Sequence, residues 1–438
     1  HNQIHHVQAV RAQIIEQIGF QCDLILVQLK LVANNLSQLL KKPYSVSLLL
    51  SYNCAHIKEA RALTGADFVM AVMSGDFVQR GAPAVFHKYM RTRMALLSGA
   101  DLVLEMPIFG SVASAEDFAS CGVSMAARTG AADFLSFGSE SGDLKLLERQ
   151  AALYEAETPE VSARIREGLK RGLSWPRARE EAFLHTNAPV PVSPNDILAC
   201  EYLRAIKSHG SSMLPVPVER NDGGYHSSGR KGSFASATAI RKALAENDLD
   251  FLTEVVPEAF FSCLKLESCP QVTADDFSMI LNEKLLTLPL CELTGISGMP
   301  EDLARKLHKN RLSFASFSER TASSKDRQYT YARVSRCLLN TVLGITREET
   351  ERFKALDSAP WLRILGFRRD ALPLLSEIKK HSTVPMITKT ADAAALLSGP
   401  SLELFYKHLQ CAELYRLAAE LKTGRPMKNE FTRSPVII

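Results

Sequence analysis

The chain has 438 residues, of which 46% are apolar and 23% are charged, and its formal net charge is +4 with a sequence pI of about 8.5. This composition is typical of a globular protein with two or three domains, and it excludes a disordered or fibrous chain. The net charge is too small to indicate a polyanionic partner unless the basic residues gather on one face.

The first 43 residues are interpreted as an N-terminal extension, with helical segments over 7–18 and 24–40 that end at a Lys-Lys-Pro linker. From Tyr44 onward, short apolar runs alternate with amphipathic segments. The runs predict strands over 46–51, 68–73, 101–104, 133–137 and 213–218. The segments between them predict helices over 56–63, 88–98, 115–128, 144–171, 176–185 and 194–206. Such alternation is typical of right-handed crossovers and a parallel sheet that is buried on both faces.

From about residue 250 the pattern is mostly helical. The predicted helices lie near 273–287, 300–308, 329–343, 346–356, 370–380, 390–397 and 401–423. We therefore expect an α/β fold, with a Rossmann-like domain and its parallel sheet over 44–255 and an α-rich C-terminal domain over 256–438.

The nine cysteines are scattered and include no Cys-x-x-Cys pair, which argues against both a disulfide framework and a zinc ribbon. No apolar run approaches the roughly eighteen residues of a membrane span, and the N-terminus lacks the pattern of a secretory signal. We expect a cytoplasmic protein with no membrane partner and no metal site of its own. The oligomeric state is not indicated.

The segment FASATAIRKAL, residues 234–244, carries small hydroxyl residues into the start of a helix. Ser236 and Thr238 alone would indicate only a helix cap. Arg241 follows one turn later, so backbone N–H groups, hydroxyls and a guanidinium can converge on one anion. With Arg220 and the glycine-rich loop before it, this pattern favours phosphate binding over simple capping.

Several segments, in one order and at compatible spacing, resemble the bacterial tRNA(Met) cytidine acetate ligase family, a branch of the nucleotidyltransferase-like superfamily. They are VMSGDFVQRG, SFGSESGD, SPNDIL, GGYHSSG, YTYARVSR and NEFTRSPVII, and the resemblance covers about residues 44–438. Any one of these segments would be a weak signal, whereas their common order is a strong one.

The resemblance implies an enzyme that condenses acetate with ATP to acetyl-adenylate and pyrophosphate, and then acetylates N4 of wobble cytidine 34 of elongator tRNA(Met). ATP, with Mg²⁺, is the implied cofactor, and acetate and the tRNA are the implied partners. The family's ATP contacts fall on Gly138, Asn195 and Arg220, and its Tyr-Asn pair falls on Tyr52 and Asn53. Read without the family, Asn195 can equally be a helix cap, and Arg220 a surface ion-pair partner.

The chain departs from the family where the first strand meets the first helix. There the family has Glu-Tyr-Asn-Pro-Phe-His-Asn-Gly-His, whereas this chain passes from Tyr52-Asn53 through Cys54-Ala55 to His56. The His-x-Gly-His turn is absent, and His56 matches a later helix histidine, so no catalytic residue is assigned. Each lost donor of this kind costs on the order of 3 kcal/mol in the transition state, so we expect weak catalysis at best.

Two further sets of residues are candidates for binding the other substrates. Gly75, Asp76, Gln79 and Arg80 form a loop after the second predicted strand, which is a common place for a second substrate such as acetate or cytosine. In the C-terminal half, arginines alternate with aromatic residues, which suits RNA phosphates and bases. The candidates for tRNA binding are Arg327, Arg333, Arg336, Arg368 and Arg369. For both sets a solvated loop or helix face is the alternative.

Three functions therefore stay open. The first is the acetate ligase, and the second is a tRNA-binding homologue whose catalysis is impaired by the shortened turn. The third is a nucleotidyltransferase that acts on a small molecule, although this function would leave the long α-rich domain without a role.

Overall fold

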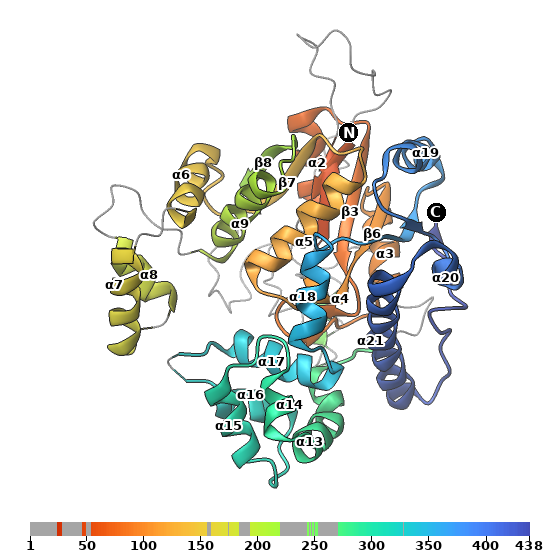
Figure 1. Ribbon diagram of the computed structural model, residues 1–438. Helices are drawn as coiled ribbons and strands as arrows, with labels where there is room; N and C mark the ends of the chain where they lie inside the picture. The colour runs from red at the N-terminus through yellow and green to blue at the C-terminus, as the bar shows by residue number, and fades with distance from the viewer. Residues whose placement is uncertain are drawn as a thin grey trace.

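The computed structural model describes residues 24–28, 46–49, 54–155, 159–173, 175–183, 193–219, 243–244, 246, 248, 250–252, 270–326 and 328–438. Over these ranges the protein has a mixed α/β architecture, with a central, mostly parallel sheet and a large group of helices below it in the view of Figure 1. The predicted fold class, an α/β domain followed by a helix-rich C-terminal region, is confirmed.

The central sheet has nine strands in the order β10-β9-β6-β3-β1-β2-β7-β8, with β11 paired to β9. Their bounds are β1 Leu24–Gln28, β2 Val46–Leu49, β3 Phe68–Ser74, β6 Leu102–Met106, β7 Phe134–Ser139, β8 Leu214–Glu219, β9 Leu362–Phe367, β10 Met386–Ile387 and β11 Val436–Ile437. The pairs β2–β3, β2–β7, β3–β6 and β7–β8 are parallel, as the alternation of strands and helices predicts. Their carboxyl ends therefore meet at one edge of the sheet, which is where α/β proteins of this kind bind ligands.

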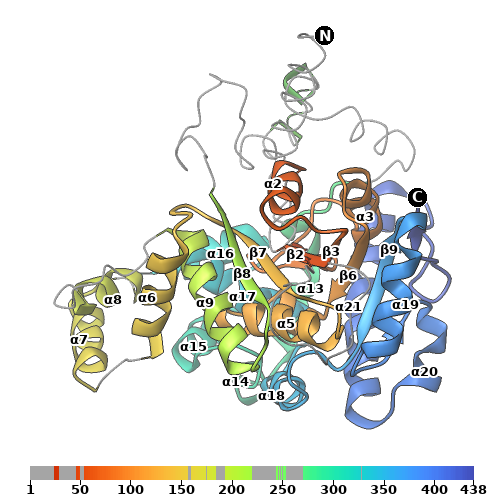
Figure 2. The same ribbon diagram turned by 90° about the horizontal axis from the view of Figure 1, so that it is seen from above.

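Helices cover both faces of the sheet, as the view from above shows (Figure 2). α2 (Cys54–Thr64) and α3 (Lys88–Leu97) lie on one face, and α5 (Ala115–Arg128) and α9 (Pro194–Ser208) lie on the other. The strands between them are mostly apolar, and β3 and β6 are almost completely buried. This double burial explains the uninterrupted apolar runs in the sequence.

The remaining helices lie around the sheet and below it in the view of Figure 1. They are α4 Ile108–Ser111, α6 Leu144–Glu155, α7 Pro159–Lys170, α8 Trp175–Phe183, α13 Ser278–Thr287, α14 Leu290–Thr294, α15 Glu301–Lys309, α16 Phe317–Ser324, α17 Tyr331–Leu343, α18 Arg347–Ala355, α19 Leu372–His381, α20 Ala393–Leu396 and α21 Gly399–Thr423. A two-stranded hairpin, β4 (Phe77–Val78) and β5 (Ala82–Pro83), lies between β3 and α3. None of the described helices has the length and apolar character that a membrane crossing requires.

The structure differs from the sequence-based expectations in three parts of the chain. The helix predicted over 24–40 is wrong at Leu24–Gln28, which forms an antiparallel strand, because periodicity cannot distinguish a short apolar strand from a buried helix. The predicted helix over 144–171 is two helices, and Pro159 begins the second. The C-terminal half, for which only helices are predicted, also contributes the strands β9, β10 and β11 to the sheet. The division at residue 255 stays a prediction.

Candidate active site

Gly138 and Asn195 lie close together at the carboxyl edge of the sheet. Gly138 is the next-to-last residue of the buried strand β7. Asn195 is in the first turn of α9, which packs against β7. The link between them is Glu140, two residues after Gly138, whose Oε1 accepts a hydrogen bond of 2.8 Å from Asn195 Nδ2. Two of the residues that the family resemblance assigns to ATP, Gly138 and Asn195, therefore lie close together at this edge of the sheet.

Glu140 and Asp196 fasten the loop after β7 to the start of α9 by reciprocal hydrogen bonds. The Glu140 carboxylate accepts the backbone N–H groups of Asn195, at 3.3 Å, and Asp196, at 2.9 Å. The buried Asp196 carboxylate in turn accepts the N–H groups of Glu140 and Ser141 and the hydroxyl of Ser139. Because a side chain already satisfies these first N–H groups of α9, this helix start is capped as well as being part of the site.

Strand β8 ends at the same edge of the sheet as β7. Gly138 is opposite Val218 and Ser139 is opposite Glu219, which is the last residue of β8. Arg220 follows Glu219 directly but lies outside the described residues, as do Tyr52, Asn53, Ser236, Thr238, Arg241 and Arg327. The assignments of these seven residues stay predictions.

Helix α2 begins at Cys54, immediately after the Tyr-Asn pair. His56, in its first turn, is 3% exposed, and its Nε2 lies 3.0 Å from the hydroxyl of Ser136 in β7. The ring is therefore packed between α2 and the sheet.

The four residues of the predicted substrate loop divide into two pairs. Gly75 and Asp76 are at the buried base, where a Cβ on Gly75 would lie 2.5 Å from Glu105 Oε1 and would displace this carboxylate. Gln79 and Arg80 are at the tip of the β4–β5 hairpin, and Arg80 is exposed. The tip contacts α17, where Arg336 donates to the Gln79 carbonyl at 3.3 Å.

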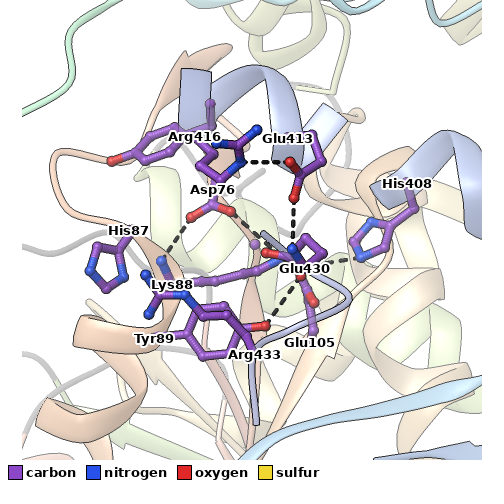
Figure 3. A network of polar contacts seen from close by, with 12 residues as sticks. Asp76, His87, Lys88, Tyr89, Glu105, His408, Glu413, Arg416, Glu430 and Arg433 are labelled. Carbon is purple, nitrogen blue, oxygen red and sulfur yellow. Dashed lines mark hydrogen bonds and ion pairs between the residues drawn. The ribbon is translucent and has the colours of Figure 1, made fainter. Parts of the chain in front are cut away.

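A buried network of charged residues supports the base of this loop (Figure 3). Lys88 of α3 is fully buried, and its Nζ lies 2.8 Å from Glu105 of β6, 3.0 Å from Glu430 and 3.6 Å from Asp76. Arg363 of β9 pairs with the same two glutamates, at 2.7 Å from Glu105 Oε2. The network therefore joins the first half of the chain to segments more than 250 residues later.

The two glutamates are charged because both cations face them. Burial alone would raise the pKa of Glu430, but the attraction of Lys88 and Arg363 lowers it to about 2. Burial likewise opposes ionisation of Glu105, and Arg363, Lys88 and His408 hold its pKa well below its ordinary value. His408 Nδ1 accepts the N–H of Ile108 at 3.1 Å, so Nε2 carries the ring proton, 3.4 Å from Glu105 Oε1.

The arginines proposed for tRNA binding do not lie together. Arg333 and Arg336 are one turn apart on α17, on the carboxyl side of the parallel strands. Arg368 and Arg369 follow β9, which is antiparallel to β6, and Arg368 lies near Asp101 at the opposite edge of the sheet. Arg368 also pairs with Asp370 at 3.0 Å. The two pairs of arginines lie at opposite edges of the sheet, and their assignment to tRNA stays a prediction.

Comparisons with known proteins agree with this architecture. A family model described as HIGH nucleotidyl transferase matches residues 54–430. The tRNA(Met) cytidine acetate ligase of Acetivibrio thermocellus is 32% identical over 396 residues, which are 87% of this chain and 95% of that protein. The protein of the same name from Bacillus subtilis is 32% identical over 405 residues, 88% of this chain and 94% of that protein.

The chain belongs to the tRNA(Met) cytidine acetate ligase family. Two solved structures of Thermotoga maritima TmcAL, at 27% identity, have the same fold: the apo form has a TM-score of 0.81 over 88% of this chain and 96% of that one. The form bound with alpha-thio ATP has a TM-score of 0.79 over 88% and 95%. The predicted membership in this ligase family is therefore confirmed.

Three residues that hold the candidate site together, Glu140, Arg363 and Glu430, were not predicted from the sequence. Glu140 stands in the quoted segment SFGSESGD, and its position two residues after Gly138 was the available signal. Arg363 and Glu430 carry no local signal, because only the fold brings them to Lys88.

Proposed function

We propose that the chain is an ATP-dependent ligase that activates acetate as acetyl-adenylate and acetylates N4 of the wobble cytidine 34 of elongator tRNA(Met). The observation that carries this proposal is the meeting of Gly138 and Asn195 at the carboxyl edge of β7, in a chain that matches most of the length of proteins with this activity in their names. The matched length includes the helix-rich C-terminal region, for which a small-molecule nucleotidyltransferase would have no evident use.

In the first step a carboxylate oxygen of acetate attacks the α-phosphorus of ATP, and pyrophosphate leaves. Gly138 allows the nucleotide to approach the backbone at the end of β7, since glycine has no side chain in the way. Asn195 is held in one orientation by Glu140, which makes it a preorganised contact for the adenosine part. The α9 start donates two of its N–H groups to Glu140, so we assign the phosphates to Arg220 and the Ser236–Arg241 segment.

In the second step N4 of cytidine attacks the acetyl carbonyl carbon, the N4 proton is lost and AMP leaves. We assign the acetate and cytosine to the loop from Gly75 to Arg80, whose base is fixed by the buried network. Magnesium would enter the site bound to the phosphate oxygens of ATP, which are its usual ligands in enzymes that use ATP. Among the described residues no group of three or more His, Cys, Asp or Glu side chains could hold a metal ion by itself.

The experiment is acetylation of unmodified elongator tRNA(Met) by the purified chain with acetate and ATP, with nucleoside mass spectrometry for N4-acetylcytidine. A tRNA in which cytidine 34 is replaced by uridine, and a reaction without ATP, are the controls. We expect acetylcytidine in the complete reaction alone, and its absence would reject the proposal for this chain.

A specific observation favours a second candidate function, a tRNA-binding homologue with impaired catalysis. α2 begins at Cys54 directly after the Tyr-Asn pair, where the family has its His-x-Gly-His turn. Specific binding of elongator tRNA(Met) without ATP-dependent release of pyrophosphate would favour this function over the ligase.

A further inference from the structure

A cavity of about 590 Å³ lies between the sheet-bearing part of the chain and the helices below it. α4, α5, α17 and α18 contribute to its walls, together with the segment from Ser297 to Pro300. This volume is within the range of small-ligand pockets. Its lining includes four basic residues, Arg333, Arg336, Arg347 and Lys354, and two acidic ones, Asp117 and Glu351.

The positive charges of this cavity exceed the negative ones that face them. Both acidic residues pair with Lys354, at 2.9 Å for Asp117 and 3.7 Å for Glu351. The arginines instead contact uncharged groups: Arg336 and Arg347 donate to backbone carbonyls, and Arg333 lies over the Tyr329 ring at 4.9 Å. Within the described part of the chain, none of the three arginines has a carboxylate at ion-pair distance.

Arg336 is the clearest case, because it is half-buried, whereas Arg333 and Arg347 are exposed. Burial lowers the pKa of its guanidinium, and the neighbouring Arg333 lowers it further. A desolvated cation without a carboxylate is unfavourable by itself, and it gains most from a bound anion. Guanidinium groups suit phosphate in particular, since their parallel N–H donors match two phosphate oxygens.

The cavity lies on the same side of the sheet as the candidate nucleotide site. Ser114, the N-cap of α5, lines the cavity, and Asn195 is in the first turn of α9. α5 and α9 both begin at the carboxyl edge and pack side by side along one face of the sheet (Figure 2). The β4–β5 hairpin, whose tip contacts Arg336, leads from the predicted substrate loop to the cavity wall.

We propose that this cavity is the subsite for a backbone phosphate of the RNA substrate, bound by Arg333, Arg336 and Arg347. The inference rests on the proposed function and adds Arg347 to its binding residues, while it leaves Arg368 and Arg369 out. Exposed Arg333 and Tyr331, at the start of α17, extend the site from the cavity to the surface, as a polymer requires and a free anion does not.

The test compares Arg333→Gln and Arg336→Gln with the matched control Arg305→Gln, which removes a positive charge from the exposed helix α15, where Arg305 pairs with Glu301. Affinity for the elongator tRNA(Met) transcript is measured by fluorescence anisotropy over a series of salt concentrations. Each cavity variant should raise the Kd about tenfold and lower the salt slope by about 1. The control should change neither quantity.

Two further measurements separate the alternatives. Arg333 is exposed, so Arg333→Gln tests the subsite even if Arg336→Gln disturbs the hairpin. A thermal shift with inorganic phosphate that is lost in Arg336→Gln, alongside unchanged RNA affinity, would assign the cavity to a free anion and overturn the RNA subsite. Unchanged RNA affinity in both variants would overturn it as well.

The subsite and the proposed function fail in distinguishable ways. Acetylcytidine formation by the unmodified chain, with RNA affinity unaffected by either variant, would reject the subsite alone. Weaker RNA binding by the variants of a chain that makes no acetylcytidine would uphold the subsite and reject the ligase activity.

Discussion

The buried network around Lys88 and the cavity beside α17 both gather basic side chains, yet they differ in what neutralises them. In the network, Lys88 and Arg363 face Glu105 and Glu430 at ion-pair distance. In the cavity, Arg333 and Arg336 face carbonyls and an aromatic ring. Charges that are neutralised within the chain fix its fold, whereas charges left without a carboxylate are suited to a ligand.

The largest effect should come from breaking the network. Glu105→Ala leaves Lys88 and Arg363 buried with too few carboxylates, and removing one partner of a buried pair typically costs about 3–5 kcal/mol. We expect a loss of this size in the free energy of unfolding, measured with urea. Glu301→Ala, which breaks the exposed pair with Arg305, is the control and should change little. A loss below about 1 kcal/mol for Glu105→Ala would show that the network is not a structural element.

Acid should weaken the network in a defined pH range. The folded-state pKa of Glu430 is lowered to about 2, so its stabilising contribution is present above the unfolded value near 4.5 and is lost as the pH falls toward 2. Urea unfolding at a series of pH values should therefore show falling stability between about pH 5 and 2. Glu430→Gln should make this fall shallower. An unchanged slope in the variant would contradict the assignment.

A smaller effect on stability is expected at the carboxyl edge of the sheet, where Glu140 contacts Asn195. Glu140→Ala removes the acceptor for the side-chain amide of Asn195 and for two backbone N–H groups, and losing such a cap costs about 1 kcal/mol. The freed Asn195 should weaken ATP binding about tenfold, corresponding to about 1.4 kcal/mol, as measured by calorimetry. Glu148→Ala, on the exposed face of α6, is the control. Equal ATP affinity in both variants would separate Asn195 from the ATP site.

The smallest effect on stability should come from the cavity. Arg336→Met removes a half-buried cation that has no carboxylate partner among the described residues, so we expect the free energy of unfolding to change by less than about 1 kcal/mol, with a small gain rather than a loss. Urea unfolding measures this change. A loss above about 2 kcal/mol would show that Arg336 stabilises the fold as Lys88 does, and the contrast between the two regions would disappear.

Local patterns in the sequence were enough to locate most of the fold around the site. The strands at β3, β6, β7 and β8 and the helices between them follow from apolar runs and helical periodicity, because both faces of a parallel sheet must be buried. The sequence pattern predicts a helix where β1 forms and does not predict β9, β10 or β11, because short apolar segments in a helical region have no distinctive period.

The amino-acid pattern alone predicts the family and the parallel sheet, together with the positions of Gly138 and Asn195 at the ends of their elements. Each of these features is carried by short local patterns, and the order and spacing of those patterns along the chain hold the information. Which charged side chains form ion pairs, by contrast, is visible only in the folded chain. Lys88 and Glu430 are 342 residues apart in the chain, yet they form an ion pair of 3.0 Å. Arg333 and Arg336, in contrast, have no carboxylate of the described residues within ion-pair distance. Pairing of this kind depends on the distances that the packed chain creates, and local sequence does not record them.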